Sequence, residues 1–250
     1  MNVMMAFLHG IIVALNVSYG RISYCGGTIY RLEKKFMEGL RTGIMKRPYI
    51  LFIALFLFTA SSTAVMAESL EEGSSEFIRA LEQEAVQSLT DKTKERPVRV
   101  AAFRKLFEEK FAVMQIGRWT LGRNWRRANE YEQREFLELF EDLIVTMYVD
   151  RFESYTGEKL KIVKTTTVDE NRATVYTEIV RPEGVDGKAI SVLWRVGRKG
   201  DIYKVLDVVI EGASMSITLQ REFASIIKNK GSVAGLIEEL RKKTNELNPS

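Results

Sequence analysis

Histidine and cysteine carry most nucleophilic catalysis and zinc binding in proteins, and this chain contains one of each. His9 and Cys25 both lie upstream of residues 45–67, a segment that is typical of an export signal. The chain after that segment therefore lacks the residues for a Ser-His-Asp or Cys-His site and for the usual zinc sites. Without a cysteine it also has no disulfide, and its core must supply the stability.

Paired carboxylates could still perform general acid–base or glycosidic chemistry. The candidates are Glu108 with Glu109, and the group Glu138, Glu141 and Asp142. Both sets fall on predicted helices whose opposite faces are apolar, so we interpret them as solvated helix faces. The sequence contains no P-loop, no GxGxxG motif and no acid-rich calcium loop.

Asp207 interrupts the apolar run from Val205 to Ile210. Catalysis would require a second group at a fixed spacing, and none is evident, although an enzyme that uses Asp207 with a tyrosine remains an alternative. Because a buried carboxylate must be hydrogen-bonded or paired, we expect Asp207 to bond a neighbouring turn or a base such as Arg221. Gly212 and Ser214 are also assigned structural roles, because a helix resumes after Gly212 with Ser214 as its cap.

One cluster combines basic and aromatic residues: Arg118, Trp119, Arg123, Trp125, Arg126 and Arg127. An exposed face that grips a helix end is one interpretation, and contact with anionic lipid headgroups or an acidic partner is another. The two tryptophans, taken alone, are more typical of a core than of a ligand site. Arg118, Arg123 and Arg126 are the predicted partner-docking residues.

The export signal begins with the basic Met45-Lys46-Arg47, continues through an apolar core and ends in small residues at Ala67. The apolar core is about ten residues, too short to span a membrane. We expect cleavage near Ala67 and a periplasmic location. Residues 1–44 are interpreted as an upstream overrun of the true start at Met45, with a long basic region or a membrane anchor as alternatives.

The charge of the exported chain argues against nucleic acid as a partner. Of the 37 Lys and Arg and the 33 Asp and Glu, seven basic and two acidic residues lie within 1–67, which leaves a formal net charge of −1. A basic surface that neutralises phosphates would require a clear positive excess. We predict no metal and no cofactor.

Residues 68–250 are predicted to form a single domain of the α+β class. Residues 68–75 are expected to be flexible, and a helical part follows at about 76–155, where apolar residues recur at helical spacing. Asn129 and Glu132 predict a capping box at the start of its strongest helix. Alternation then predicts about four antiparallel strands at about 160–211, before C-terminal helices at about 212–246.

Two stretches of the sequence resemble a known family. The first is Leu121 to Arg126 with Gln133, Phe136, Phe140 and Tyr148, and the second is Asp207 to Ser214 with Arg221, Phe223 and Gly231. They are similar to the MlaC-type toluene-tolerance family of periplasmic phospholipid-binding proteins, over nearly all of 76–241. Ala112 and Tyr203 depart from that pattern, which leaves room for a sibling branch associated with hopanoid handling.

The resemblance implies a fold like that of nuclear transport factor 2, with a curved sheet and helices around an apolar cavity. It also implies a non-enzymatic shuttle that exchanges phospholipid between an outer-membrane lipoprotein complex and an inner-membrane ABC transporter complex, and so maintains outer-membrane lipid asymmetry. A pure adaptor with a solid interior is a third hypothesis. Its interior would contain no space for a lipid.

A cavity for mobile acyl chains should be lined by aliphatic, aromatic and methionine side chains. Core packing is an equal alternative for each candidate, because both environments select the same residue types. The predicted lipid-binding residues are Phe140, Ile144, Met147, Tyr148, Val175, Ile179, Val192, Trp194, Met215, Leu219 and Phe223.

Overall fold

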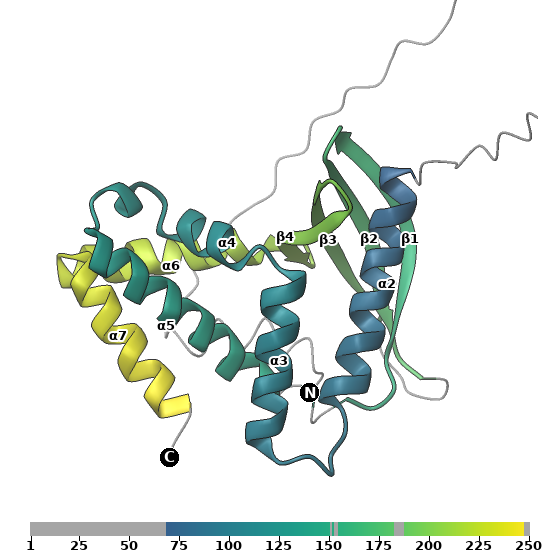
Figure 1. Cartoon of the computed structure of the whole chain (residues 1–250), viewed down its shortest axis with the longest axis horizontal. Helices are drawn as coiled ribbons and strands as arrows, with labels where there is room; N and C mark the ends of the chain where they lie inside the picture. Colours follow the sequence, from purple (N-terminus) through teal and green to yellow (C-terminus); the bar gives the residue numbers. More distant parts are fainter. Residues whose placement is uncertain (1–68, 151, 153–154, 183–187, 248–250) are drawn as a thin grey trace, which may run out of the picture. The chain divides into compact units, whose positions relative to one another are not determined.

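The structure is a computed structural model that describes residues 69–150, 152, 155–182 and 188–247 (Figure 1). All of them belong to one compact unit of the chain. The predicted export signal and the stretch before it lie outside the described residues. Within the described ranges, no helix combines the length and the apolar character that crossing a bilayer requires.

The sheet is an antiparallel meander in which the strands follow one another in chain order (Figure 1). Its strands are β1 (Lys159–Asp169), β2 (Arg172–Val180), β3 (Ile190–Lys199), β4 (Ile202–Ile210) and β5 (Ala213–Ser214). The sequence predicts about four strands, and the two-residue β5 is the addition. It forms because Glu211 and Gly212 adopt φ angles of 48° and 83°, which reverse the chain.

Helices precede and follow the sheet, so the predicted α+β class is confirmed. They are α2 (Leu70–Leu89), α3 (Arg96–Lys110), α4 (Val113–Leu121), the 3-10 helix η1 (Gly122–Arg126), α5 (Glu130–Val149), α6 (Met215–Lys230) and α7 (Val233–Leu247). The capping box of Asn129 and Glu132 is present at the start of α5. Ser214 caps α6 by accepting from the Ile217 N–H.

The first helix begins earlier than the sequence predicts. Residues 70–75 are helical rather than flexible, because Ser69 accepts from the Glu72 N–H and caps the helix there. Acidic residues in the first turn favour this start. Two side chains of the turn also reach the sheet: Glu71 accepts from the Thr167 N–H, and the Ser75 and Thr165 hydroxyls lie 2.6 Å apart.

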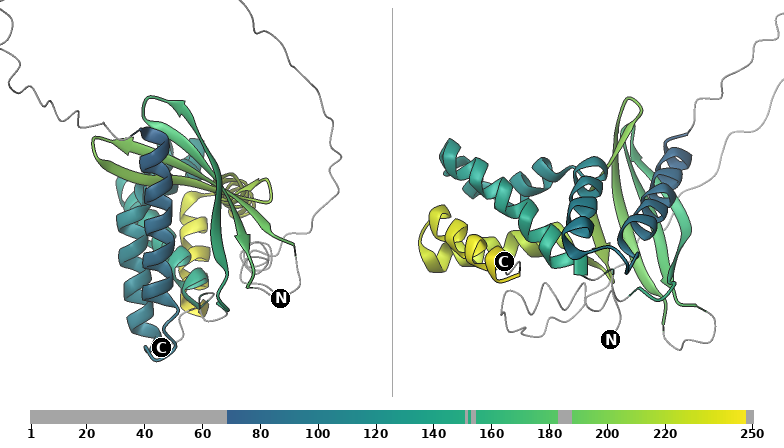
Figure 2. Two further views of the ribbon diagram at one scale, coloured as in Figure 1. Left: turned by 90° about the vertical axis from the view of Figure 1, so that its right-hand side faces the viewer. Right: turned by 60° about the horizontal axis from the view of Figure 1, so that its bottom comes forward.

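Helices α2 and α3 lie side by side over one face of the sheet (Figures 1 and 2). Ile78 and Leu81 of α2 are buried in one cluster with Val175, Val196 and Val205 of the strands. Burial of a large aliphatic side chain contributes about 1.5–3 kcal/mol. This cluster therefore holds α2 against the sheet.

The C-terminal end of α3 is fixed to β4 by polar contacts. The Ala112 N–H donates to the Val205 carbonyl at 2.9 Å. The Lys204 ammonium donates to the last carbonyls of α3, those of Glu108 and Glu109, at 2.8 and 2.6 Å. A cation at a helix C-terminus satisfies otherwise unpaired carbonyls and favours the helix dipole.

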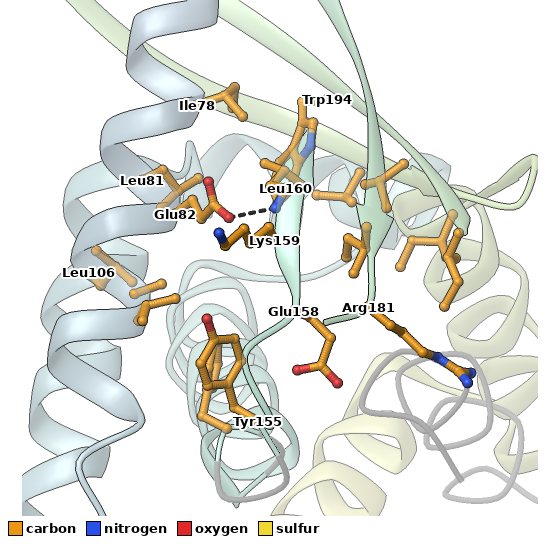
Figure 3. A pocket seen from close by; sticks show the side chains of 18 of the residues that line it. Ile78, Leu81, Glu82, Leu106, Tyr155, Glu158, Lys159, Leu160, Arg181 and Trp194 are labelled. Carbon is orange, nitrogen blue, oxygen red and sulfur yellow. Dashed lines mark hydrogen bonds between the residues drawn. The ribbon is translucent and has the colours of Figure 1, made fainter. Parts of the chain in front are cut away.

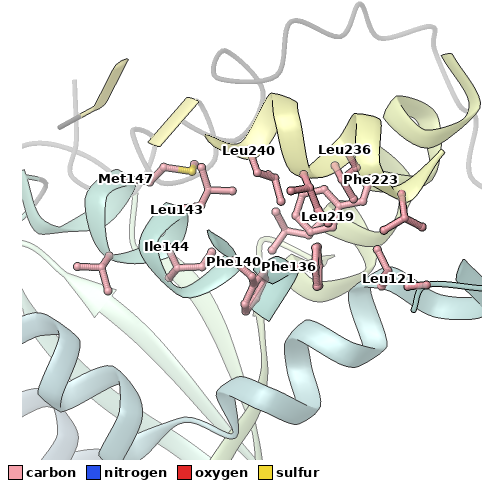
Figure 4. Close-up of a cluster of buried hydrophobic side chains, with 14 of the residues drawn as sticks. Leu121, Phe136, Phe140, Leu143, Ile144, Met147, Leu219, Phe223, Leu236 and Leu240 are labelled. Carbon is pink, nitrogen blue, oxygen red and sulfur yellow. The ribbon is translucent and has the colours of Figure 1, made fainter. Parts of the chain in front are cut away.

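A second core joins α4, α5, α6 and α7 (Figure 4). Phe136 and Phe223 are fully buried, and their rings meet edge to face at 5.6 Å and 89°. Phe140 adds a second edge-to-face contact with Phe223. Such pairs contribute about 0.5–1.5 kcal/mol beyond area burial. The helical part therefore has a tightly packed aromatic centre.

Asp207 links β4 to the start of α6, and both of its carboxylate oxygens are occupied. One oxygen accepts from Arg195 at 3.1 Å and from the Ser214 hydroxyl at 2.7 Å. The other accepts from the N–H and the hydroxyl of Ser216. The predicted bond to a neighbouring turn is present, but the base is Arg195 rather than Arg221. Register explains this, because Arg195 lies directly opposite Asp207 on the neighbouring strand.

Replacing Asp207 with asparagine should destabilise the fold without changing its shape. The Asp207→Asn variant loses the charge and replaces one acceptor oxygen by an amide donor. That donor would face either Arg195 and the Ser214 hydroxyl or the N–H and hydroxyl of Ser216. We expect a loss of about 2–4 kcal/mol in the free energy of unfolding, measured by urea titration. Arg195→Gln is the matched control, and it should cost less because the Arg195 side chain is 54% exposed. Equal stability of Asp207→Asn and the parent protein would contradict this role.

Glu222 on α6 carries a second buried carboxylate, and it has no comparable network. Its Oε2 atom is buried without a hydrogen-bond partner among the described residues. Burial raises the pKa of Glu222 from its ordinary value of 4.5 to about 7. Between these two values the folded protein binds more protons than the unfolded chain, so stability falls as the pH rises.

Glu222→Gln should flatten this part of the stability profile. The gain in unfolding free energy of the variant over the parent should grow between pH 4.5 and about 7, and stay constant above that range. Urea titrations at a series of pH values measure it. Glu238→Gln, at an exposed position on α7, is the matched control. Parallel profiles for Glu222→Gln and the parent would show that burial does not perturb this group.

Candidate functional site

A cavity of about 260 Å³ lies between α2, α3 and the sheet (Figure 3). Its walls are aliphatic and aromatic over most of their area, and charged side chains are few. The lining residues are Ile78, Leu81, Glu82, Ala85, Val86, Phe103, Leu106, Phe111, Phe152, Tyr155, Glu158, Lys159, Leu160, Ile179, Arg181, Lys188, Ile190, Val192, Trp194, Val208 and Ile210.

Helical spacing on α2 and alternation on the strands make these side chains face the same cavity. On α2, the lining positions 78, 81, 82 and 85 follow helical spacing and form one face. On β3, the lining residues Ile190, Val192 and Trp194 alternate along the strand, as do Val208 and Ile210 on β4. Since alternate residues of a strand face the same side, the helix and the sheet contribute one wall each.

Two polar side chains of the apolar wall, those of Trp194 and Glu82, are hydrogen-bonded within it. The Trp194 indole N–H donates to the Thr177 hydroxyl at 3.1 Å, and that hydroxyl donates to the Val192 carbonyl at 2.9 Å. Glu82 accepts from the Leu160 N–H at 2.6 Å, across the boundary between α2 and β1 (Figure 3). The wall therefore offers a ligand mainly dispersion and hydrophobic contact.

One end of the cavity is polar, and we define this polar end as Tyr155, Glu158 and Arg181 (Figure 3). Burial, together with the nearby negative charges, raises the pKa of the Tyr155 hydroxyl. Burial opposes ionisation of Glu158, but hydrogen bonds from Thr156 and the charge of Arg181 outweigh it and lower the pKa of Glu158. The Glu158 carboxylate thus lies near the Arg181 guanidinium where the apolar walls end.

Three of the predicted lipid-binding residues, Ile179, Val192 and Trp194, line this cavity. Val175 is buried against α2 instead. The remaining seven lie in or against the helical core around α5, where their neighbours are other side chains: Phe140, Ile144, Met147, Tyr148, Met215, Leu219 and Phe223. Sequence reasoning missed the face of α2 and the aromatics Phe103 and Phe111. The helical spacing of 78, 81 and 85 was the available signal.

The predicted docking residues Arg118, Arg123 and Arg126 are exposed and lie on α4 and η1, away from the cavity lining. The expectation that both tryptophans are core residues holds for Trp125, which packs against the helical core. Trp119 differs, because its side chain is 45% exposed.

Two of the acidic groups that could have performed acid–base chemistry are paired with a base. Arg104 of α3 donates to Glu141 and to Asp142 of α5 and so joins the two helices. Among the residues that the structure describes, no three His, Cys, Asp or Glu side chains gather in a way that could hold a metal ion.

Comparison with known proteins decides the family. A sequence profile described as MlaC protein matches residues 76–242. The chain belongs to the MlaC family. The match covers both helical parts and the sheet, including every strand that lines the cavity.

A curated relative and a solved structure illustrate the similarity. The intermembrane phospholipid transport system binding protein MlaC of Haemophilus influenzae is 24% identical over 131 residues, which cover 52% of this chain and 61% of that protein. A phospholipid-binding protein of Ralstonia solanacearum, solved in complex with a phospholipid, superimposes with a TM-score of 0.59 at 18% identity. That comparison covers 69% of this chain and 97% of the other, and it shows that the two share a fold.

The hydrogen bond between Glu82 and the Leu160 N–H should contribute measurably to the free energy of unfolding and hold β1 against α2. The Glu82→Ala variant leaves an N–H of the edge strand without its carboxylate acceptor, and we expect a loss of about 1–2 kcal/mol in urea unfolding. Amide exchange at Leu160 should also accelerate. Glu76→Ala, whose side chain is 65% exposed on the same helix, should cost less than about 0.5 kcal/mol. Unchanged exchange at Leu160 would exclude a role for Glu82 in closing the wall.

Proposed function

We propose that this protein is a periplasmic lipid shuttle that shields the acyl chains of a phospholipid in the cavity under α2 and α3. The observation that carries the proposal is a cavity with mainly apolar walls, in which Trp194 and Glu82 are hydrogen-bonded, and with a polar end that includes Glu158 and Arg181. A phospholipid has the same division, with apolar tails and a charged headgroup. Its tails would occupy the apolar part, and its headgroup would lie at the polar end.

The free-energy cost of moving a phospholipid through water without such a cavity is large. Two acyl chains carry roughly 30 methylenes, and exposing each to water costs about 0.8 kcal/mol, so crossing an aqueous gap unaided is opposed by about 20 kcal/mol. A carrier lowers this cost by burial alone and requires no reactive group. The cavity of about 260 Å³ is the space present without a ligand, and side chains along its walls would move apart around the tails.

The partners in this proposal are an inner-membrane ABC transporter complex and an outer-membrane lipoprotein complex, between which the protein exchanges lipid and so maintains outer-membrane lipid asymmetry. Cleavage of the export signal near Ala67 would release it into the periplasm. Membership of the MlaC family supports this role, as does the similarity to the intermembrane phospholipid transport protein of Haemophilus influenzae.

The alternatives make different demands on the same structure. An enzyme that uses Asp207 would need a free carboxylate, whereas both Asp207 oxygens are hydrogen-bonded and the residue is absent from the cavity lining. A hopanoid-associated carrier of a sibling branch would use the same apolar walls with a rigid ring system. Native mass spectrometry distinguishes the two ligands by mass.

Narrowing the cavity should remove the lipid. Protein produced with its export signal in a Gram-negative host should copurify with phospholipid in native mass spectrometry. The Ala85→Trp variant places an indole between α2 and the sheet, and the loss of space for two to three methylenes should weaken binding about 10- to 50-fold. Uptake of a fluorescent phospholipid from liposomes measures this change.

Ala224→Trp on α6 is the matched control, because Ala224 is exposed and lies outside the cavity lining. It should bind lipid like the parent protein. A parent protein that carries no lipid after gentle purification, and takes none up from liposomes, would refute the carrier function. Equal binding by Ala85→Trp and Ala224→Trp would place the lipid outside this cavity.

A further inference from the structure

A stretch without acidic residues separates the two halves of the helical part. Between Lys110 and Glu130 the sequence contains four arginines and neither aspartate nor glutamate. Arg118 lies on α4, Arg123 and Arg126 lie on η1, and Arg127 follows directly; all four are exposed. The rest of residues 68–250 contains 26 basic and 31 acidic residues, a formal net charge of −5, so this concentration of positive charge is a local feature.

Exposed apolar side chains accompany these arginines. Met114 is 68% exposed, Trp119 45% and Tyr131 66%, all within or next to the same stretch. We define the arginine surface as Arg118, Arg123, Arg126 and Arg127 with these three residues. Arginine, tryptophan, tyrosine and methionine are the types enriched where proteins bind other proteins.

The arginines are not used to hold the fold together. Among the described residues, none of the four makes an ion pair, and none donates a hydrogen bond to a helix end. Arg118 contacts only an aromatic ring, with its guanidinium 5.5 Å from the centre of the Trp125 ring. The interpretation of these arginines as a helix-end grip is therefore not supported, and their charges are available to a partner.

The backbone below the arginine surface is nevertheless firmly held. Gln133 donates to the carbonyls of Trp125 and Ala128, and Gln220 of α6 donates to the carbonyl of Trp119. Leu121 and Ala128 are buried in the helical core. A fixed backbone that presents unused charges lowers the entropic cost of binding a partner.

The arginine surface and the polar end of the cavity lie at opposite ends of α5. Helix α5 begins at Glu130, directly after the arginines, and ends at Val149, shortly before Phe152 and Tyr155 of the cavity. Twenty residues of helix span about 30 Å at 1.5 Å per residue. Figure 1 shows α5 running from η1 toward α3. A bilayer that contacted the arginine surface would thus lie far from the place where a lipid would enter.

We propose that the arginine surface is a docking site for an acidic protein surface, which holds the carrier while the polar end of its cavity remains free to exchange lipid. This inference rests on the proposed carrier function, since a carrier must be positioned against donor and acceptor. Charge complementarity attracts an acidic partner and accelerates association. The exposed side chains of Trp119 and Met114 would add apolar contact.

Site-specific photocrosslinking in exporting cells tests this assignment. The full-length protein carries p-benzoylphenylalanine in place of Trp119 or, as a second variant, in place of Tyr131. The same residue in place of Val168, which is 60% exposed on β1, is the control position. We expect a protein adduct from the first two positions, with a contacted peptide rich in Asp and Glu, and no such adduct from Val168.

Charge reversal then tests the electrostatic part. Adding Arg123→Glu with Arg126→Glu should reduce the adduct about tenfold or more. Lys161→Glu with Lys199→Glu, two exposed positions on β1 and β3, makes the same change in net charge and should leave the adduct unchanged. An adduct that survives the arginine reversal, or a contacted peptide without acidic residues, would overturn the proposal.

A membrane is the competing partner, and flotation with vesicles of phosphatidylethanolamine and phosphatidylglycerol measures it. Binding to these vesicles that disappears in the arginine reversal, with no protein adduct, would replace the acidic protein by a lipid surface and refute our assignment. Native mass spectrometry of each variant reports lipid content separately. Absence of lipid in the parent protein would refute the carrier function. If the parent protein retains lipid but the arginine reversal leaves the adduct unchanged, only the docking proposal is refuted.

Discussion

The attachment of α3 to β4 is the constraint on which the cavity depends. The Ala112 N–H and the Lys204 ammonium hold the last turn of α3 at the sheet. Phe111 lies at this point, lines the cavity and also packs against both the sheet cluster and the helical core. Because dense cores on either side resist collapse, α2 and α3 cover the sheet while a space remains between their apolar faces and the strands.

The helices and strands could be predicted from the sequence more fully than the cavity between them. The capping box at Asn129, the proline at the start of α3 and the alternation of β3 follow from local chemistry, and the structure contains all three. The first turn of α2 was missed because its Gly and Ser residues favour a loop locally. Contacts with β1 and the Ser69 cap override that preference.

The position of the cavity could not be read from periodicity, for a physical reason. An apolar face on α5 and an apolar face on α2 have the same pattern in the sequence, yet the first packs against α7 and the second borders empty space. Whether a face is filled depends on where its helix is anchored in three dimensions. Strand residues were easier, because alternation fixes which side of the sheet Val192 and Trp194 occupy.

The glutamates of α2 that accept hydrogen bonds from β1 also protect an edge of the sheet. Among the residues that the structure describes, β1 pairs with β2 alone and so forms an edge of the sheet. Such edges can recruit another chain into a growing aggregate. Glu82 and Glu71 occupy outward N–H groups of that edge at Leu160 and Thr167. The same helix that covers the cavity thereby blocks strand addition, which favours a monodisperse protein.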